Sequence, residues 1–332
     1  MSWRLSLLDK SPLADGETPS QALARTLELA KRAEEWGFHR FWLAEHHNTP
    51  SLASPSPEVL IGWILAQTRR IRVGSGGVML QHYSPYKVAE NFNLLASLAP
   101  GRVDLGVGKA PGGLPLSTRA LQQGLHQDEK GDFAAQLEQL DSWLHPAKQD
   151  NQRDTLYATP LPAQPPQRFL LGASEGSARL AASLGWQFVF AAHLNGDAEE
   201  QARALHTYHH HSGGLRAILA VQVIVAATPA KANALAQDQQ QYRVHSDNGQ
   251  SVTVVNLQQA EAFIRQSGAT ESRIEPRTTS ILTGTAAQVH AQLDALHQRF
   301  AIAEFIIDTP ISNGPERIKS LELLATHQRV TA

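Results

Sequence analysis

The sequence contains no cysteine among its 332 residues. This absence excludes disulfide bonds, thiolate catalysis, and zinc or iron–sulfur sites held by cysteine. Long basic runs are also missing and the formal net charge is −2, so nothing attracts the chain to nucleic acid or to an acidic membrane surface. No apolar stretch approaches the roughly 18–20 residues of a membrane span, and the N-terminus lacks the charged start and apolar run of a signal peptide. We therefore expect a cytoplasmic protein with no nucleic-acid or membrane partner.

The pattern of hydrophobic residues predicts strands and helices that alternate along the chain. The first helix shows the local signals: Thr18 begins it in a capping box with Gln21, and Gly37 ends it. Alternation with short loops is typical of parallel βαβ units. The predicted strands cover residues 3–8, 39–44, 71–80, 102–107, 169–171, 187–191, 215–227, 278–282 and 304–308.

Two stretches interrupt this alternation. Residues 109–130 contain a loop with glycine and proline, and residues 229–275 look helical and irregular. We interpret both as insertions in a (β/α)₈ TIM barrel of about eight strand–helix units, which forms a single domain over residues 1–332.

Two adjacent histidines follow the second predicted strand. In an α/β barrel the catalytic groups lie where strands end at the C-terminal face, and this strand ends in Glu45, His46 and His47. Neighbouring side chains of an extended chain point to opposite sides, so the pair is poorly placed to share one metal ion. One imidazole can face the barrel mouth as an acid, a base or a hydrogen-bond donor. The alternative is one buried structural histidine and one loop histidine.

Glycines are concentrated in the third and fourth predicted strands. Glycine weakens a strand unless something passes close to the backbone; a flat ligand would explain Gly76 and Gly77, and a bulge or tight packing is the alternative. The fourth strand ends with Gly106 and Gly108, but the third glycine of a dinucleotide fingerprint is missing and a proline-containing loop follows. This departure excludes a Rossmann site.

Small polar residues follow the fifth predicted strand and lead directly into a helix. Ser174, Gly176 and Ser177 lie at the start of that helix, where free N–H groups and the helix dipole favour a phosphate. Lys109, after the fourth strand, could supply the counter-charge. An ordinary serine N-cap is the alternative, and Glu175 would oppose an anion unless its side chain points outward.

Several blocks in order resemble the bacterial luciferase-like flavin monooxygenases, and most closely their single-gene oxidoreductase branch. The resemblance spans nearly the whole chain. The matching blocks are FWLAEHHN at 41–48, IRVGSGGVML at 71–80, PYKVAE at 85–90, PGRVDLGVG at 100–108, LGAS at 171–174, LAA at 180–182 and TGT at 283–285.

The resemblance implies a binding site for FMN at the barrel mouth. It places His46 beside the oxygen-reactive carbon of the flavin, and it matches Gly76 and Gly77 to a pair joined by a cis peptide under the flavin ring. Lys109, Ser174 and Ser177 match the phosphate contacts, with Gly176 between the serines. The branch usually has arginine where this chain has Lys109; lysine binds phosphate as a point charge without the arginine fork, so FMN affinity should be lower.

The function implied by the resemblance is that of a monooxygenase. Reduced FMN, supplied by a separate NAD(P)H-dependent flavin reductase, and dioxygen would oxygenate a small substrate such as an aldehyde or ketone. We also expect a homodimer. The alternatives are a deazaflavin-dependent hydride-transfer enzyme of the same fold, a flavin-binding protein without turnover, and a metal hydrolase using His46, His47 and Asp308, against which the glycine-rich third strand argues.

Overall fold

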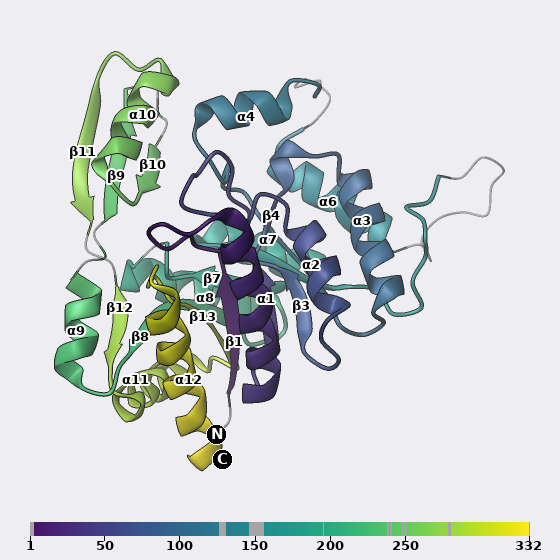
Figure 1. Ribbon diagram of the computed structural model, residues 1–332. Coiled ribbons are helices and arrows are strands. Elements are labelled where there is room, and N and C mark those ends of the chain that lie inside the picture. The colour runs from purple at the N-terminus through teal and green to yellow at the C-terminus, as the bar shows by residue number, and fades with distance from the viewer. Residues whose placement is uncertain are drawn as a thin grey trace.

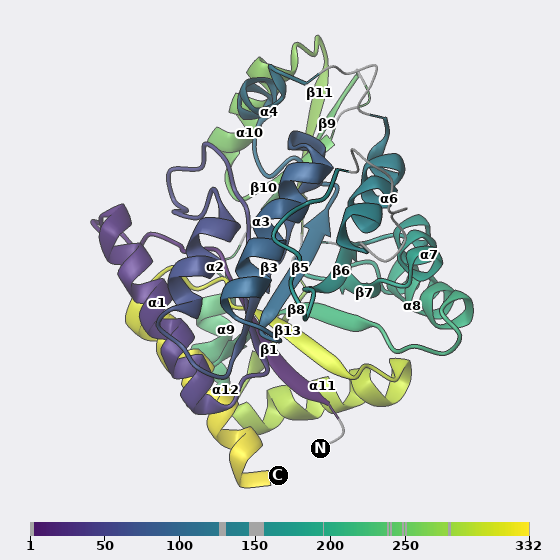
Figure 2. The same ribbon diagram turned by 90° about the vertical axis from the view of Figure 1, so that its right-hand side faces the viewer.

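The computed structural model describes residues 3–125, 131–145, 156–194, 196–237, 239, 241–247, 249, 251–277 and 280–331. Within these residues, eight parallel strands close into a barrel, because each pairs with the next and the last pairs with the first. This closure confirms the predicted TIM barrel (Figure 1 and Figure 2). In barrel order the strands are β1 (Arg4–Asp9), β2 (Arg40–Leu43), β3 (Arg72–Ser75), β5 (Val103–Gly108), β6 (Gln167–Gly172), β7 (Gln187–Ala191), β8 (Ile218–Val225) and β13 (Glu304–Asp308).

Helices cover the outside of the barrel, and local sequence sets their ends. The predicted capping box is present, since Thr18 Oγ1 accepts from the Gln21 N–H at 3.3 Å and the Gln21 side chain accepts from the Thr18 N–H at 2.9 Å. Gly37 ends the first helix with a φ of 83°, a conformation that glycine adopts without a steric penalty. The barrel helices are α1 (Pro19–Trp36), α2 (Pro57–Leu65), α3 (Pro85–Leu98), α6 (Phe133–Leu144), α7 (Glu175–Leu184), α8 (Ala198–His211), α11 (Ala286–Phe300) and α12 (Gly314–Thr331).

The strand predicted at residues 71–80 is divided in the structure. β3 ends at Ser75, the peptide bond between Gly76 and Gly77 is cis, as the resemblance implies, and β4 (Val78–Met79) then pairs with β5 before the short 3₁₀ turn η1 (Leu80–His82). A Cβ atom on Gly77 would lie only 2.8 Å from the carbonyl oxygen of Gly106. The close approach of β5 therefore accounts for this glycine, in agreement with the packing alternative.

The strand predicted at residues 278–282 is not one of the barrel strands. Residues 278–279 lie outside the described residues, and β12 (Ile281–Gly284) pairs with residues 222–225 of β8. The part of β8 that pairs with β7 ends earlier, at Ala220. β12 therefore lengthens the barrel wall above β7 and does not add a strand to the ring.

The first insertion contains α4 (Pro115–Gln122), and the second contains α9 (Pro229–Gln237), α10 (Leu257–Ser267) and an antiparallel sheet of β9 (Gln241–Ser246), β10 (Ser251–Val254) and β11 (Ser272–Arg277). α4 of the first insertion and the sheet and α10 of the second lie above the C-terminal end of the barrel, whereas α9 lies beside β8 and β12 (Figure 1 and Figure 2). The expectation of a helical, irregular second insertion missed this sheet. Its strands are short and mostly half-exposed, and only Val244 and Val254 are buried, against α10. With so few buried positions, the alternation of hydrophobic and polar residues along these strands is too weak for the strands to be predicted from the sequence.

The barrel is filled inside and closed at its N-terminal end. Arg40 forms ion pairs with Asp104 at 2.8 Å and with Glu304 at 2.6 Å, and all three side chains are buried. The apolar interior of the barrel consists of Leu8, Trp42, Ala44, Phe169, Val189, Ile218, Ala220 and Ile306.

The described helices include none that is long and apolar enough to span a bilayer.

Candidate active site

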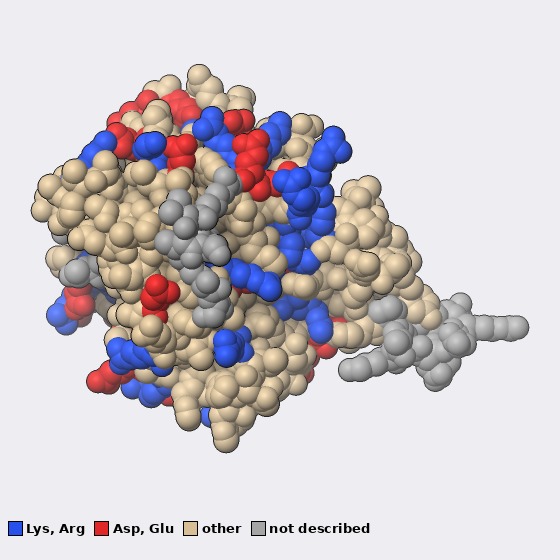
Figure 3. Space-filling model, turned by 90° about the horizontal axis from the view of Figure 1, so that it is seen from below, with Lys and Arg blue, Asp and Glu red and all other residues tan. Residues whose placement is uncertain are grey.

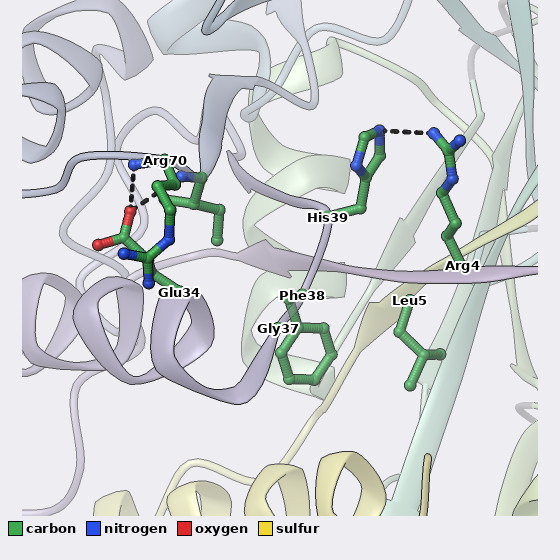
Figure 4. A pocket seen from close by; sticks show the side chains of 8 residues that line it. Arg4, Leu5, Glu34, Gly37, Phe38, His39 and Arg70 are labelled. Carbon is green, nitrogen blue, oxygen red and sulfur yellow. Dashed lines mark hydrogen bonds between the residues drawn. The ribbon is translucent and has the colours of Figure 1, made fainter. Parts of the chain in front are cut away.

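Two hollows lie at the N-terminal end of the barrel, away from the expected site. One, of about 340 Å³, has Arg4, Glu34 and His39 on its wall (Figure 4). Its polar groups already have partners: Glu34 Oε1 accepts three backbone N–H groups, those of Arg69, Arg70 and Ile71, and an Arg4 nitrogen lies 3.2 Å from Nε2 of His39. This hollow is therefore explained by the packing of α1 against the loop before β3.

The second hollow, of about 650 Å³, lies beside the base of β6 and β7. Two of its arginines are committed to ion pairs, Arg40 with Asp104 and Glu304, and Arg168 with Asp141. Figure 3 shows the molecule from this side; most of the face is uncharged, and acidic and basic side chains lie next to one another in places. Such mutual pairing stabilises the base of a barrel, whereas its chemistry belongs at the opposite end.

His46 lies at that opposite end, just after β2. Its backbone N–H donates to the carbonyl of Ser54 at 2.9 Å, and its Nδ1 atom is buried with no hydrogen-bond partner among the described residues. Burial, and then the nearby positive charge of Lys10, lower the pKa of His46 to about 3. At neutral pH it is therefore a neutral imidazole, in which one ring nitrogen donates and the other accepts a hydrogen bond, and not a cationic acid.

His47 points to a different partner. Its Nε2 atom lies 2.7 Å from Oε1 of Glu45, which also accepts from the Tyr83 hydroxyl at 2.8 Å, while Glu45 Oε2 accepts from the Met79 N–H at 3.0 Å. The backbone N–H of His47 donates to Gly112. His47 is thus the buried structural histidine of the two, and it holds the first insertion against β4.

The metal-hydrolase alternative requires His46, His47 and Asp308 to converge. His47 is bonded to Glu45 instead, and the described residues contain no group of three or more His, Asp or Glu side chains placed to hold one ion. The geometry therefore gives this alternative no support.

The residues of the predicted phosphate cradle follow two adjacent barrel strands, and Ser174 forms the serine N-cap that the sequence also allowed. Ser174 Oγ accepts the N–H of Ser177 at 3.3 Å at the start of α7. Exposed Lys109 follows β5, which pairs with the strand that precedes α7. Glu175 points outward, where its carboxylate lies 3.3 Å from the Arg203 guanidinium on α8. The objection that Glu175 would repel an anion is thereby removed, and the residues present fit a phosphate group.

The sequence-predicted residues follow four consecutive barrel strands. His46 follows β2, Gly76 and Gly77 follow β3, Lys109 follows β5, and the two serines follow β6. A Cβ on Gly76 would lie 2.8 Å from Cδ1 of Leu8 in the barrel interior, so contact of this glycine with a flavin stays a prediction.

Sequence reasoning missed a second polar group, on the other side of the barrel mouth. Lys10 follows β1, and its Nζ donates to Oδ2 of Asp308, the last residue of β13, at 2.6 Å. Gln222 of β8 donates to the same oxygen at 3.3 Å, and His193 follows β7. The rule that chemistry gathers at strand ends would have found Lys10 and His193. Of this group, Asp308 alone was named from the sequence, as a metal ligand in the metal-hydrolase alternative.

The charges of this second group are set by burial and by one another. Burial would raise the pKa of Asp308, but Lys10 and His193 outweigh it and hold the pKa at about 2, so the carboxylate is ionised. Burial lowers the pKa of His193 to about 4. Among the described residues, Asp308 Oδ1 and Nδ1 of both His46 and His193 are buried without a partner. An atom of this kind costs about 1–3 kcal/mol while it has no partner, so a bound molecule that supplies the partners would be stabilised here.

The comparison with known proteins decides the family. The luciferase-like monooxygenase model matches residues 4–302, from β1 through α11. The chain belongs to the luciferase-like monooxygenase family. It is 43% identical, over 97% of both chains, to the N-acetyl-S-alkylcysteine monooxygenase of Bacillus subtilis (strain 168). The crystal structure of apo-MsnO8 matches 98% of both chains with 30% identity and a TM-score of 0.80.

Two further structures share the fold at lower identity. The oxygenating constituent of 3,6-diketocamphane monooxygenase from Pseudomonas putida, in complex with FMN, has a TM-score of 0.68 at 16% identity and covers 98% of this chain and 97% of its own. An F420-dependent secondary alcohol dehydrogenase has a TM-score of 0.67 at 14% identity and covers 97% of this chain and 98% of its own. This luciferase-like monooxygenase is thus an oxygenating, flavin-dependent oxidoreductase on a fold that also serves F420.

Proposed function

We propose that the chain is an FMN-dependent monooxygenase that acts on a small organic acid. The observation that carries this proposal is the 43% identity, over 97% of both chains, to a monooxygenase. The cradle at the start of α7 supports FMN as the flavin, because Ser174, Ser177 and Lys109 present hydrogen-bond donors and a positive charge suited to a terminal phosphate.

Reduced FMN would supply two electrons to dioxygen, so that one oxygen atom enters the substrate and the other leaves as water. The protein supplies position and shelter. Neutral His46 would hold a hydrogen bond at the barrel mouth. We further propose that a separate NAD(P)H-dependent reductase delivers the reduced flavin, as expected from the family resemblance.

For the substrate we propose an N-acylated S-alkylcysteine or a similar thioether acid. The named relative supports this class. The aldehyde or ketone expected from the sequence is the substrate class against which this proposal is tested. The deazaflavin-dependent and non-catalytic alternatives differ from the proposal in one respect: neither incorporates oxygen from dioxygen into a product.

The test is a turnover with chemically reduced FMN and ¹⁸O₂. N-acetyl-S-methylcysteine and a medium-chain aldehyde are supplied in separate reactions, and the masses of the products are measured by mass spectrometry. One labelled oxygen atom per product molecule is expected with the thioether acid. Oxygen consumption with no labelled product from either compound, or oxidation of a secondary alcohol with F420 in place of FMN, would contradict the proposal.

We also propose that the chain forms a homodimer through α2 and α3. α2 buries Leu60, Ile61 and Ile64, yet Val59 on its outer side is 68% exposed, and Leu98 on the neighbouring α3 is 70% exposed. A helix that is apolar on all sides is normally covered on all sides. Light scattering should give twice the 36.2 kDa mass of the chain, and Leu98→Glu should lower it. A monomer at micromolar concentration would contradict the proposal.

A further inference from the structure

Asp308 differs from the other buried carboxylates in the described residues. Five are buried, and in four of them both oxygens accept hydrogen bonds from the protein: Asp9, Glu45, Asp104 and Glu304. Asp308 is the exception, because Oδ2 accepts from Lys10 and Gln222 while Oδ1 has no donor.

The comparison with Asp9 shows that position does not explain the difference. Asp9 ends β1 as Asp308 ends the neighbouring β13, and each is 1% exposed. Asp9 is nevertheless satisfied, since Arg317 donates to Oδ1 at 2.7 Å and Thr26 donates to Oδ2 at 2.7 Å. Asp9 therefore serves the fold, whereas Oδ1 of Asp308 has no donor among the described residues.

Lys10 offers the complementary charge beside that oxygen. An ammonium group has three protons, and among the described residues Lys10 Nζ donates one hydrogen bond, to Asp308 Oδ2. The Lys10 side chain is 25% exposed at the barrel mouth, so the remaining protons are within reach of a bound molecule. His46 and His193 flank the pair with neutral imidazoles and add no net charge.

We propose that Lys10 and Asp308 form the substrate-anchoring subsite of this enzyme. Asp308 Oδ1 accepts the amide N–H of an N-acyl amino acid, and Lys10 donates to the carboxylate of the same molecule. One carbon separates these two groups in such a substrate, so a single adjacent acid–base pair can bind both. The inference rests on the proposed function for the substrate class and assigns the residues that recognise it.

The test measures binding by calorimetry to the FMN-loaded protein with three probes. They are N-acetyl-S-methylcysteine, its analogue with an ester oxygen in place of the amide N–H, and its carboxyl methyl ester. The wild-type protein should prefer the first probe over each analogue by about 10- to 100-fold, as expected for hydrogen bonds to charged groups. Asp308→Asn should abolish the preference for the amide, and Lys10→Met the preference for the free acid.

Matched controls come from a surface ion pair of the same kind. Lys231 and Glu316 lie 2.8 Å apart, with Lys231 exposed and Glu316 half-exposed, so Lys231→Met and Glu316→Gln should keep both preferences. If either single variant at the subsite fails to fold, the double variant Lys10→Met with Asp308→Asn removes the pair without leaving a lone charge, and it should lose both preferences.

FMN affinity separates a substrate subsite from a cofactor contact. The variants at Lys10 and Asp308 should bind FMN as tightly as the wild type does; a loss of FMN affinity would assign the pair to the flavin and overturn the proposal. If the variants kept the wild-type probe preferences, the subsite proposal would be overturned. Labelled product from the thioether acid would in that case still support the proposed function. No probe binding together with oxygenation of the aldehyde would overturn the subsite and the substrate class, but not the oxygenase.

Discussion

The Nε2 atom of His47 lies 2.7 Å from Oε1 of the buried Glu45. This contact turns one member of the histidine pair toward the loop around β4. Its neighbour His46 instead leaves Nδ1 without a partner among the described residues. Two adjacent and chemically identical side chains therefore have different roles, one structural and one available to a ligand.

The first prediction concerns His46 and the coupling of oxygen consumption to product. His46→Ala should fold and bind FMN, because the phosphate cradle lies on other strands. Reduced flavin should still consume oxygen but release hydrogen peroxide, and product formation should fall by about 10²–10⁴-fold, the usual contribution of one positioned group. Peroxide and product are measured in the same reaction.

The control for this prediction is His206→Ala, an exposed histidine of α8, which should couple normally. His47→Ala should lose stability while the remaining folded enzyme stays coupled. Normal coupling in His46→Ala, or uncoupling confined to His47→Ala, contradicts the assignment.

A second prediction follows from the bond between Tyr83 and Glu45. Tyr83→Phe removes a donor from a buried carboxylate and should lower the free energy of unfolding by about 1.5–3 kcal/mol, as measured by urea denaturation. Tyr208 is the matched control, because its hydroxyl donates to the uncharged carbonyl of Trp186 at 3.0 Å. Tyr208→Phe should cost about 0.5–1.5 kcal/mol. The reverse order of the two losses would contradict the prediction.

A third prediction addresses the phosphate cradle. Lys109→Met should weaken FMN binding about tenfold, and Lys109→Arg should tighten it because the guanidinium fork bonds two phosphate oxygens. Riboflavin, which has no phosphate, should bind all three proteins equally. Fluorescence titration checks both statements, and a loss of riboflavin affinity in Lys109→Met would place Lys109 elsewhere in the site.

The redox state of the flavin should also matter. A flavin delivered by a separate reductase must leave once oxidised, so oxidised FMN should bind more weakly than reduced FMN. Anaerobic titration compares the two. Equal affinities, or oxidised FMN retained through purification, would indicate a resident cofactor.

A fifth prediction concerns stability at acid pH. Burial lowers the pKa of His46 to about 3 and of His193 to about 4, below the ordinary value of 6.5. Below about pH 6.5 these histidines therefore bind protons in the unfolded chain but not in the folded chain. The free energy of unfolding consequently falls as pH decreases. Each histidine contributes a slope of up to about 1.4 kcal/mol per pH unit. Ionised Asp308 adds a further loss only between about pH 3.8 and pH 2.

Urea denaturation from about pH 7 to pH 4.5 measures this slope. His193→Gln should make it shallower, whereas replacing exposed His206 by Gln should not. A stability that is flat over this range would mean that both imidazoles are protonated in the folded protein.

The sequence by itself determined the barrel and one half of the site. Alternating strand and helix periods are local patterns, and so are the capping box at Thr18 and the serine cap at Ser174, so they can be read without knowing what packs where. Strand order then follows from the closed βαβ topology, which places residues after β2, β3, β5 and β6 side by side. His46, Lys109 and Ser174 were singled out in this way, the family resemblance assigned their roles, and those roles stay predictions.

Only the tertiary structure decided the rest, because it depends on partners distant in the chain. Lys10 and Asp308 are 298 positions apart, and neither carries a local signal that it will pair with the other. The choice between His46 and His47 was set by the carboxylate and hydroxyl that Glu45 and Tyr83 bring together. The sheet of β9, β10 and β11 likewise depends on α10 for its buried face. Local periodicity reports which side of an element is apolar, but the fold alone determines which buried polar atoms find a partner and which are left for a ligand.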